Sequence, residues 1–182
     1  MDVDPFAPLH QAAFAVALLV GGLVGSFLNV VAYRVPEGRS VVAPASACPR
    51  CGHGIRPHHN IPVLGWLLLR GRCADCGAPI APRYPLVEAG CAALFGAVFL
   101  AVAPAADDAA DAPHLIAFGL NACYFGALLA ISLIDADHFI VPDSISLPLI
   151  PLGIAAAAVL DLLGAPSPGL PSAVLGAALG AG

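Results

Sequence analysis

Residues 12–33 read AAFAVALLVGGLVGSFLNVVAY, an apolar run without a single charged side chain. At about 1.5 Å per residue, a helix of this length crosses a hydrocarbon core of roughly 30 Å. Three further apolar runs follow, at residues 85–104, 114–134 and 144–163. Pro148 and Pro151 lie inside the last run and are expected to kink it. The pattern predicts an all-α polytopic membrane protein built as a helical bundle.

The first run could instead be a secretory signal peptide. Against that reading, Asp2 and Asp4 precede it where a signal peptide carries basic residues. Gly21, Gly22 and Gly25 have a spacing suited to close helix packing. We predict that these glycines serve packing and no chemistry.

The composition excludes an ordinary soluble domain. Hydrophobic residues make up 59% of the chain and charged residues only 10%, whereas a soluble domain has about a quarter of its residues charged. The formal net charge is −5, but the charges are segregated: all seven basic residues are arginines between Arg34 and Arg83. Beside long apolar runs, membrane topology explains such arginines, so we predict contact with membrane lipid and no nucleic-acid partner.

The arginines also predict the orientation. Positive charges stay on the cytoplasmic side of a bacterial inner membrane, so residues 34–84 should be cytoplasmic and the N-terminus outside. The turn at residues 107–111 is then outside, and residues 135–143 return to the cytoplasmic side. A fifth apolar run begins near Ser172 and continues to Gly182. It reaches only about half of the roughly 20 residues that a span needs, which suggests a chain cut off inside a helix.

Residues 34–84, here called the four-cysteine loop, contain Cys48-Pro-Arg-Cys51-Gly and Cys73-Ala-Asp-Cys76-Gly. Two C-x-x-C pairs at about this separation predict a zinc site that staples a loop without a long apolar stretch of its own. Four thiolates leave no open coordination position, so the metal is expected to be structural. Two redox dithiols or two disulfides are the alternative interpretations.

The other candidate ligands receive a simpler interpretation. His53, His58 and His59 are expected to be solvated loop residues. Cys91 and Cys123 fall in predicted spans and are expected to be small buried apolar residues.

The third apolar run ends in Asp135-Ala-Asp137-His138, and Pro142-Asp143 follows. A carboxylate at a membrane edge is costly and therefore invites a functional interpretation, and two carboxylates sharing a proton can activate water. Asp135 directly follows the apolar run and is expected to be the most buried. Asp137 and His138 are predicted to be solvated loop residues, and Asp143 is predicted to be a helix N-cap.

The motifs together resemble the type IV prepilin leader peptidases, which are bifunctional membrane aspartic proteases and N-methyltransferases. The resemblance covers nearly the whole chain. It rests on Gly25-Ser-Phe-Leu-Asn-Val-Val-Ala-Tyr-Arg-Val-Pro36, Ser46-Ala-Cys-Pro-Arg-Cys-Gly-His53, Asn60-Ile-Pro62, Arg83-Tyr-Pro-Leu-Val-Glu88, Ser132-Leu-Ile-Asp-Ala-Asp-His138 and Pro142-Asp143.

The resemblance implies an activity. Such enzymes remove the basic leader from type IV prepilins and pilin-like secretion proteins at the cytoplasmic membrane face. They then methylate the new N-terminus with S-adenosylmethionine. Asp135 would be the first catalytic aspartate. The second lies in a Gly-x-Gly-Asp motif that is absent from these residues, and Asp161, on the predicted outer side, is a poor replacement. The chain by itself is therefore expected not to cleave, and no residue is assigned to the methyl donor.

The resemblance also suggests a division of the chain. Residues 1–33 would hold the outer N-terminus and first span, residues 34–84 the methyltransferase-associated zinc loop, and residues 85–182 the first part of the peptidase domain. A basic leader would be repelled by the arginines unless Glu37, Asp75 or Glu88 contacts it. Two other functions stay open: a non-catalytic membrane assembly factor that binds a partner through the zinc loop, and a membrane thiol oxidoreductase.

Overall fold

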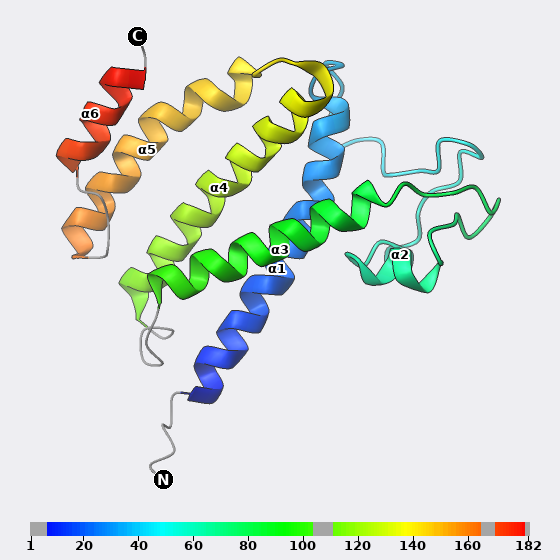
Figure 1. Ribbon diagram of the computed structural model, residues 1–182, viewed down its shortest axis with the longest axis horizontal. Helices are drawn as coiled ribbons and strands as arrows, with labels where there is room; N and C mark the ends of the chain where they lie inside the picture. Colours follow the sequence, from blue (N-terminus) through cyan, green and yellow to red (C-terminus); the bar gives the residue numbers. More distant parts are fainter. Residues whose placement is uncertain (1–6, 104–110, 165–169, 181–182) are drawn as a thin grey trace.

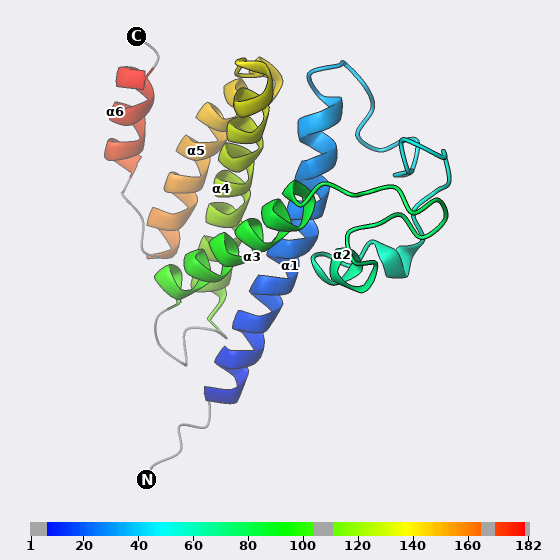
Figure 2. The same ribbon diagram turned by 45° about the vertical axis from the view of Figure 1, so that its right-hand side comes forward.

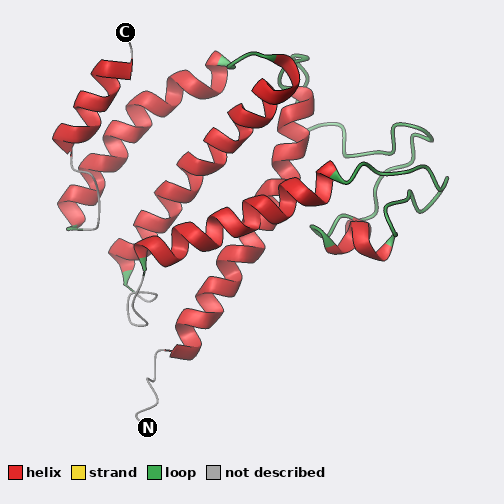
Figure 3. Ribbon diagram, viewed as in Figure 1, coloured by secondary structure: helices red, strands yellow, loops and turns green. Residues whose placement is uncertain are grey.

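The computed structural model describes residues 7–103, 111–164 and 170–180, and these form helices joined by loops (Figures 1 and 3). The described parts contain no named strand, only two isolated β-bridges. The helices are α1 (Ala7–Arg34), η1 (Pro57–His59), α2 (Leu64–Leu68), α3 (Arg83–Val102), α4 (Ala112–His138), α5 (Asp143–Leu163) and α6 (Leu170–Gly180).

Four of these helices, α1, α3, α4 and α5, are long and apolar enough to cross a membrane. They correspond to the four runs predicted from the sequence, so the prediction of an all-α membrane bundle is confirmed. The fifth run corresponds to α6. Most of the turn expected at residues 107–111 lies outside the described residues.

The predicted helix ends need correction at the acidic motif. Helix α4 continues to His138, so Asp137 and His138 belong to its last turn and are not loop residues. Asp143 is the first residue of α5, whose N-cap is Pro142 without a side-chain hydrogen bond, so the N-cap prediction for Asp143 is wrong. The α5 helix runs through both Pro148 and Pro151.

Helices α1 and α3 cross at two glycines (Figures 1 and 2). A Cβ atom on Gly21 would lie 2.8 Å from the backbone of Cys91 and Ala92, and one on Gly25 would lie 2.8 Å from the Glu88 Cα. The two glycines are one turn apart. Because neither has a side chain, the α3 backbone can approach the α1 backbone closely there. The prediction of close helix packing is confirmed for Gly21 and Gly25, whereas Gly22 lies against Pro62 of the four-cysteine loop.

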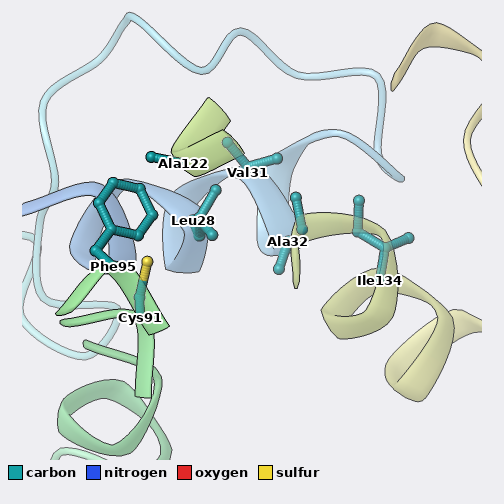
Figure 4. Packing of buried hydrophobic residues seen from close by; sticks show 8 residues of the cluster. Leu28, Val31, Ala32, Cys91, Phe95, Ala122 and Ile134 are labelled. Carbon is teal, nitrogen blue, oxygen red and sulfur yellow. The ribbon is translucent and has the colours of Figure 1, made fainter. Parts of the chain in front are cut away.

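The main hydrophobic cluster forms where α4 meets the α1–α3 pair. Figure 4 shows Cys91 and Phe95 of α3 beside side chains from α1 and α4. Cys91 is fully buried, as predicted. Cys123 is exposed, so the prediction that it is buried is wrong. The buried members of the cluster are Leu28, Val31, Ala32, Cys91, Phe95, Ala122, Ala130 and Ile134.

Because successive spanning helices run in opposite directions, four helix ends lie at the same end of the bundle. There α1 and α4 finish and α3 and α5 begin, next to the four-cysteine loop; we call this the loop end (Figure 1). Arg83 of α3 binds Asp137 of α4 with two short contacts of 2.7 and 2.6 Å, in the paired geometry of a guanidinium and a carboxylate. At the opposite end, the His10 ring Nε2–H donates to the Ala103 carbonyl at 2.9 Å.

We predict that Gly25→Ala destabilises the protein by about 1–3 kcal/mol, because the added methyl group forces the two backbones apart. Gly90→Ala is the matched control: Gly90 lies inside the partner helix α3, but a Cβ atom there meets nothing within 4 Å. The control should be neutral or slightly stabilising. Unfolding in detergent micelles measures both, and equal effects would contradict the role of the glycine crossing.

Candidate functional site

The first cysteine pair lies in a tight knuckle. The Cys48 N–H donates to the His53 carbonyl, and the Gly52 N–H donates back to the Cys48 carbonyl, both at 2.9 Å. Gly52 has φ = +74°, a left-handed conformation that glycine adopts without strain. This turn brings the two sulfurs of Cys48 and Cys51 to the same side of the backbone.

The second pair repeats the same geometry. The Cys73 N–H donates to the Ala78 carbonyl at 2.8 Å, and the Gly77 N–H donates to the Cys73 carbonyl at 2.9 Å. Gly77 has φ = +70°. The glycine that follows each C-x-x-C pair therefore does what the sequence predicts, and the two knuckles are structural copies of each other.

All four sulfurs of the two knuckles lie within 4.8 Å of one another. The Cys48 and Cys76 sulfurs, from different knuckles, are 3.8 Å apart. Tetrahedral zinc with Zn–S bonds of about 2.3 Å separates its sulfurs by roughly 3.8 Å. The cluster of Cys48, Cys51, Cys73 and Cys76 could therefore hold a metal ion, and all four are free thiols. No histidine of the described residues belongs to it.

The thiols of the first knuckle differ in acidity. Backbone N–H groups of Cys51 and Arg50 point at the Cys48 sulfur and lower the pKa of its thiol to about 6. At Cys51 a backbone hydrogen bond from His53 lowers the pKa, but desolvation and the neighbouring thiols outweigh it and raise the pKa to about 12. Four thiols this close cannot all ionise by themselves, whereas a dication stabilises every thiolate at once.

Ion pairs and buried polar contacts hold the loop in place. Arg56, after the first knuckle, binds Asp75, inside the second, at 2.9 Å. At the end of α1 the buried Arg34 guanidinium donates to the carbonyls of Ser40 and Pro44, at 3.0 and 2.9 Å. The side chain of Arg34 thereby folds the start of the loop back onto the helix end.

The middle of the loop is attached to the bundle through Glu88. The Glu88 carboxylate accepts a hydrogen bond from the Val63 N–H at 2.6 Å, in a partly buried position. Val63 is the N-cap of α2, and the neighbouring Pro62 lies against Gly22 of α1. Within the loop, the indole N–H of Trp66 of α2 donates to the Ile80 carbonyl at 3.0 Å and so connects α2 to the segment after the second knuckle.

The three acids proposed to meet a basic leader are already engaged. Glu37 binds Arg39 at 3.0 Å, Asp75 binds Arg56, and Glu88 accepts the Val63 N–H. A ligand would have to displace these partners to reach the carboxylates.

Asp135 lies in the last turn of α4, at the loop end of the bundle. Its backbone carbonyl accepts the N–H of Phe139, whose left-handed conformation terminates the helix. Asp135 is exposed, as are Asp137 and Asp143, so the structure does not bury its carboxylate as the sequence suggests. The preceding Ile134 is the residue that faces the core and is fully buried.

Two hollows lie near this end. An apolar groove of about 740 Å³ runs between α3 and α4, and a smaller hollow of about 230 Å³ lies beside Asn29 and Tyr84. S-adenosylmethionine needs partners for an amino acid, a sulfonium and an adenosine, which the groove does not offer; the smaller hollow is below the usual size of a cofactor site. The groove is lined by Pro82, Arg83, Leu86, Val87, Gly90, Leu94, Leu129 and Leu133.

Comparison with known proteins gives two matches in chain order. A family model described as the bacterial peptidase A24 N-terminal domain matches residues 19–102, and one described as the type IV leader peptidase family matches residues 122–182. The chain belongs to the type IV leader peptidase family. This confirms the resemblance drawn from the motifs, which fall within the two matched ranges.

Members of this family that resemble the chain include proteins named prepilin leader peptidase/N-methyltransferase. The one from Myxococcus xanthus is 44% identical, over 96% of this chain and 47% of its own length. Those from Pseudomonas aeruginosa and Neisseria gonorrhoeae are 43% and 38% identical, over 86% and 94% of this chain and 59% and 63% of their own lengths. The chain thus spans about half to two thirds of these relatives. No solved structure matches it.

Sequence reasoning missed two contacts that position the site. The Arg83–Asp137 pair joins the start of α3 to the end of α4, and the Glu88–Val63 hydrogen bond joins α3 to the loop. A signal was present in both cases, since Arg83 and Glu88 are charged residues at the start of an apolar run. Their partners, however, are distant in the sequence and are revealed only by the fold.

We predict that Glu88→Leu loosens the four-cysteine loop, because it leaves the Val63 N–H without its acceptor. A hydrogen bond to a charged group is worth about 1.5–3 kcal/mol, so cleavage by trypsin at the exposed Arg70 and Arg72 should accelerate by about tenfold or more. Glu37→Leu, which removes the loop's exposed glutamate, is the control and should leave the rate unchanged. Equal rates for the two variants would argue against Glu88 as the anchor.

Proposed function

We propose that the chain carries the cysteine loop and the first catalytic aspartate of a prepilin leader peptidase and N-methyltransferase. The observation that carries this proposal is the order of the two family matches together with the position of Asp135. The second match contains Asp135, which lies in the last turn of α4 at the loop end of the bundle. In this assignment residues 1–33 form the N-terminus and first span, residues 34–84 the methyltransferase-associated loop, and residues 85–182 the first part of the peptidase domain.

In this proposal the protein lies in a bacterial inner membrane with the N-terminus outside and the four-cysteine loop in the cytoplasm. The arginines support this orientation, because all of them lie between Arg34 and Arg83. The substrates are type IV prepilins and pilin-like secretion proteins, whose leader meets an apolar helix at the cytoplasmic membrane edge. Asp135 lies at that edge, where the scissile peptide would be presented.

Asp135 acts with a second carboxylate in this mechanism. The two acids share one proton, and the ionised one takes a proton from water as the water attacks the peptide carbonyl. Because the sequence contains no Gly-x-Gly-Asp motif, we propose that residues 1–182 by themselves do not cleave. The Arg83–Asp137 pair would hold the last turn of α4 against α3 and so fix the position of Asp135.

The metal in this proposal is a structural zinc ion held by Cys48, Cys51, Cys73 and Cys76. Four thiolates saturate tetrahedral zinc, so the ion supplies rigidity and leaves no position for water or substrate. Reduced cytoplasmic thiols favour a metal over disulfides. Methyl transfer from S-adenosylmethionine is assigned to the loop only as a whole, since neither hollow at the loop end suits that cofactor.

We predict that the purified protein contains about one zinc ion per chain. Cys51→Ser should lose it, because three thiolates hold the ion far less tightly, and a chelator should release it from the unmodified protein. Cys123→Ser, which replaces an exposed cysteine outside the cluster, should retain full occupancy. Metal analysis by mass spectrometry decides, and a metal-free, disulfide-linked loop would favour a thiol oxidoreductase instead.

A second prediction concerns Asp135 and requires the sequence encoded downstream of Gly182. That sequence should contain Gly-x-Gly-Asp. In the extended protein Asp135→Asn should reduce leader cleavage on the order of 10³-fold or more. Methylation of a pilin that is already cleaved should persist, because the aspartate dyad takes no part in it. Both activities are followed by mass spectrometry of the pilin N-terminus.

Asp161→Asn is the control for Asp135→Asn, since it makes the same change at the opposite end of the bundle and should cleave normally. Retained cleavage by Asp135→Asn would remove Asp135 from its role. A downstream sequence without the second aspartate would favour the non-catalytic assembly factor.

A further inference from the structure

The four-cysteine loop contains an apolar stretch at residues 61–69, IPVLGWLLL, in which no side chain is charged. Five of these residues form the short helix α2. Leu64, Leu67 and Leu68 project from it and are 56%, 55% and 73% exposed. These three leucines lie on one short helix, and the described residues leave them uncovered. They form an apolar patch that requires an explanation.

The attachment of α2 places it well below the loop end of the bundle. Pro62 lies against Gly22, twelve residues before the end of α1 at Arg34. At 1.5 Å per residue that is roughly 18 Å along the helix axis. The second attachment agrees, because Val63 binds Glu88 at the level where Glu88 packs on Gly25. Figures 1 and 2 both show α2 beside the middle of α1.

This depth lies inside a bilayer that α1 spans. With 28 residues α1 is about 42 Å long, whereas the hydrocarbon core is roughly 30 Å thick. A centred α1 therefore projects about 6 Å beyond the core at each end. A segment attached roughly 18 Å below the end of α1 then lies about 12 Å inside the core, deep in the leaflet on the loop side.

The surroundings of the patch suit lipid. On α1, Leu19 and Leu23 flank Gly22 along the helix and are themselves 59% and 53% exposed, so the apolar patch of α2 continues the lipid-facing surface of a spanning helix. Arg70 and Arg72 follow directly and are exposed. Long arginine side chains that follow an apolar segment can extend from the acyl chains toward the anionic headgroups.

We propose that α2 is a membrane-inserted anchor that buries Leu64, Leu67 and Leu68 among the acyl chains of the leaflet on the loop side. The anchor holds the four-cysteine cluster beside the membrane independently of the helix ends. It connects to the cluster through Trp66, whose indole N–H donates to Ile80, and whose ring packs on Gly71, close to Cys73 in the chain. The proposal does not depend on the catalytic role of Asp135.

Trp66 is the only tryptophan of the chain and serves as the probe. The whole protein is reconstituted into vesicles of equal parts phosphatidylcholine and phosphatidylglycerol. The acyl chains are brominated either near the headgroup or near the terminal methyl group. We expect bromine near the terminal methyl group to quench more than half of the Trp66 fluorescence, and bromine near the headgroup to quench less. Aqueous iodide should quench little.

Variants test the leucines themselves. Leu67→Ser with Leu68→Ser should weaken quenching by lipid and increase quenching by iodide. Val42→Ser, at a loop valine that is 87% exposed outside α2, should change neither. Equal metal content in all variants verifies that the cluster has formed. The proposal is overturned if brominated lipid leaves the fluorescence of the unmodified protein unchanged, as it would if the patch were covered by a protein partner or by a second copy.

Discussion

The close approach of α1 and α3 at Gly21 and Gly25 is the constraint on which the rest of the structure depends. It lets the two backbones touch and so fixes where α3 begins relative to the end of α1. Arg83 at that beginning then reaches Asp137, and Glu88 one turn further reaches the loop. A wider separation of the two helices would disturb both contacts at once, although neither involves a glycine.

Much of the architecture could be predicted because its causes are local. The local sequence is enough to predict the spanning helices from the apolar runs. It is also enough to predict the knuckles from the two C-x-x-C pairs and the glycines after them. The errors arose where the outcome depends on distant partners. Asp135 follows an apolar run, yet the periodicity of the helix turns Ile134 to the core and leaves Asp135 outside. Residues 61–69 fall in the predicted loop although their apolar character is evident, because the local sequence does not indicate what such a short segment packs against.

The four-cysteine loop has two supports of different kinds. The proposed metal ligation would act inside the loop, where the two knuckles bring four sulfurs together without a hydrophobic core. The hydrogen bond between Val63 and Glu88 and the contact between Pro62 and Gly22 act between the loop and the spanning helices. The first support depends on metal and redox state, whereas the second depends on helix packing, so loss of one need not remove the other.

The exposure of Asp135 bears on the proposed mechanism. A carboxylate shares a proton with its partner only when water is largely excluded and the second acid is close. Asp135 is exposed in the described part of the chain, so water is not excluded from it. What α4 contributes is position: the adjacent Ile134 is buried in the core, and Asp137, two residues further on, is held by Arg83, so the last turn of α4 is fixed while the Asp135 side chain stays accessible. A rigid but uncovered acid is what a two-carboxylate site requires before its second half and its substrate close over it.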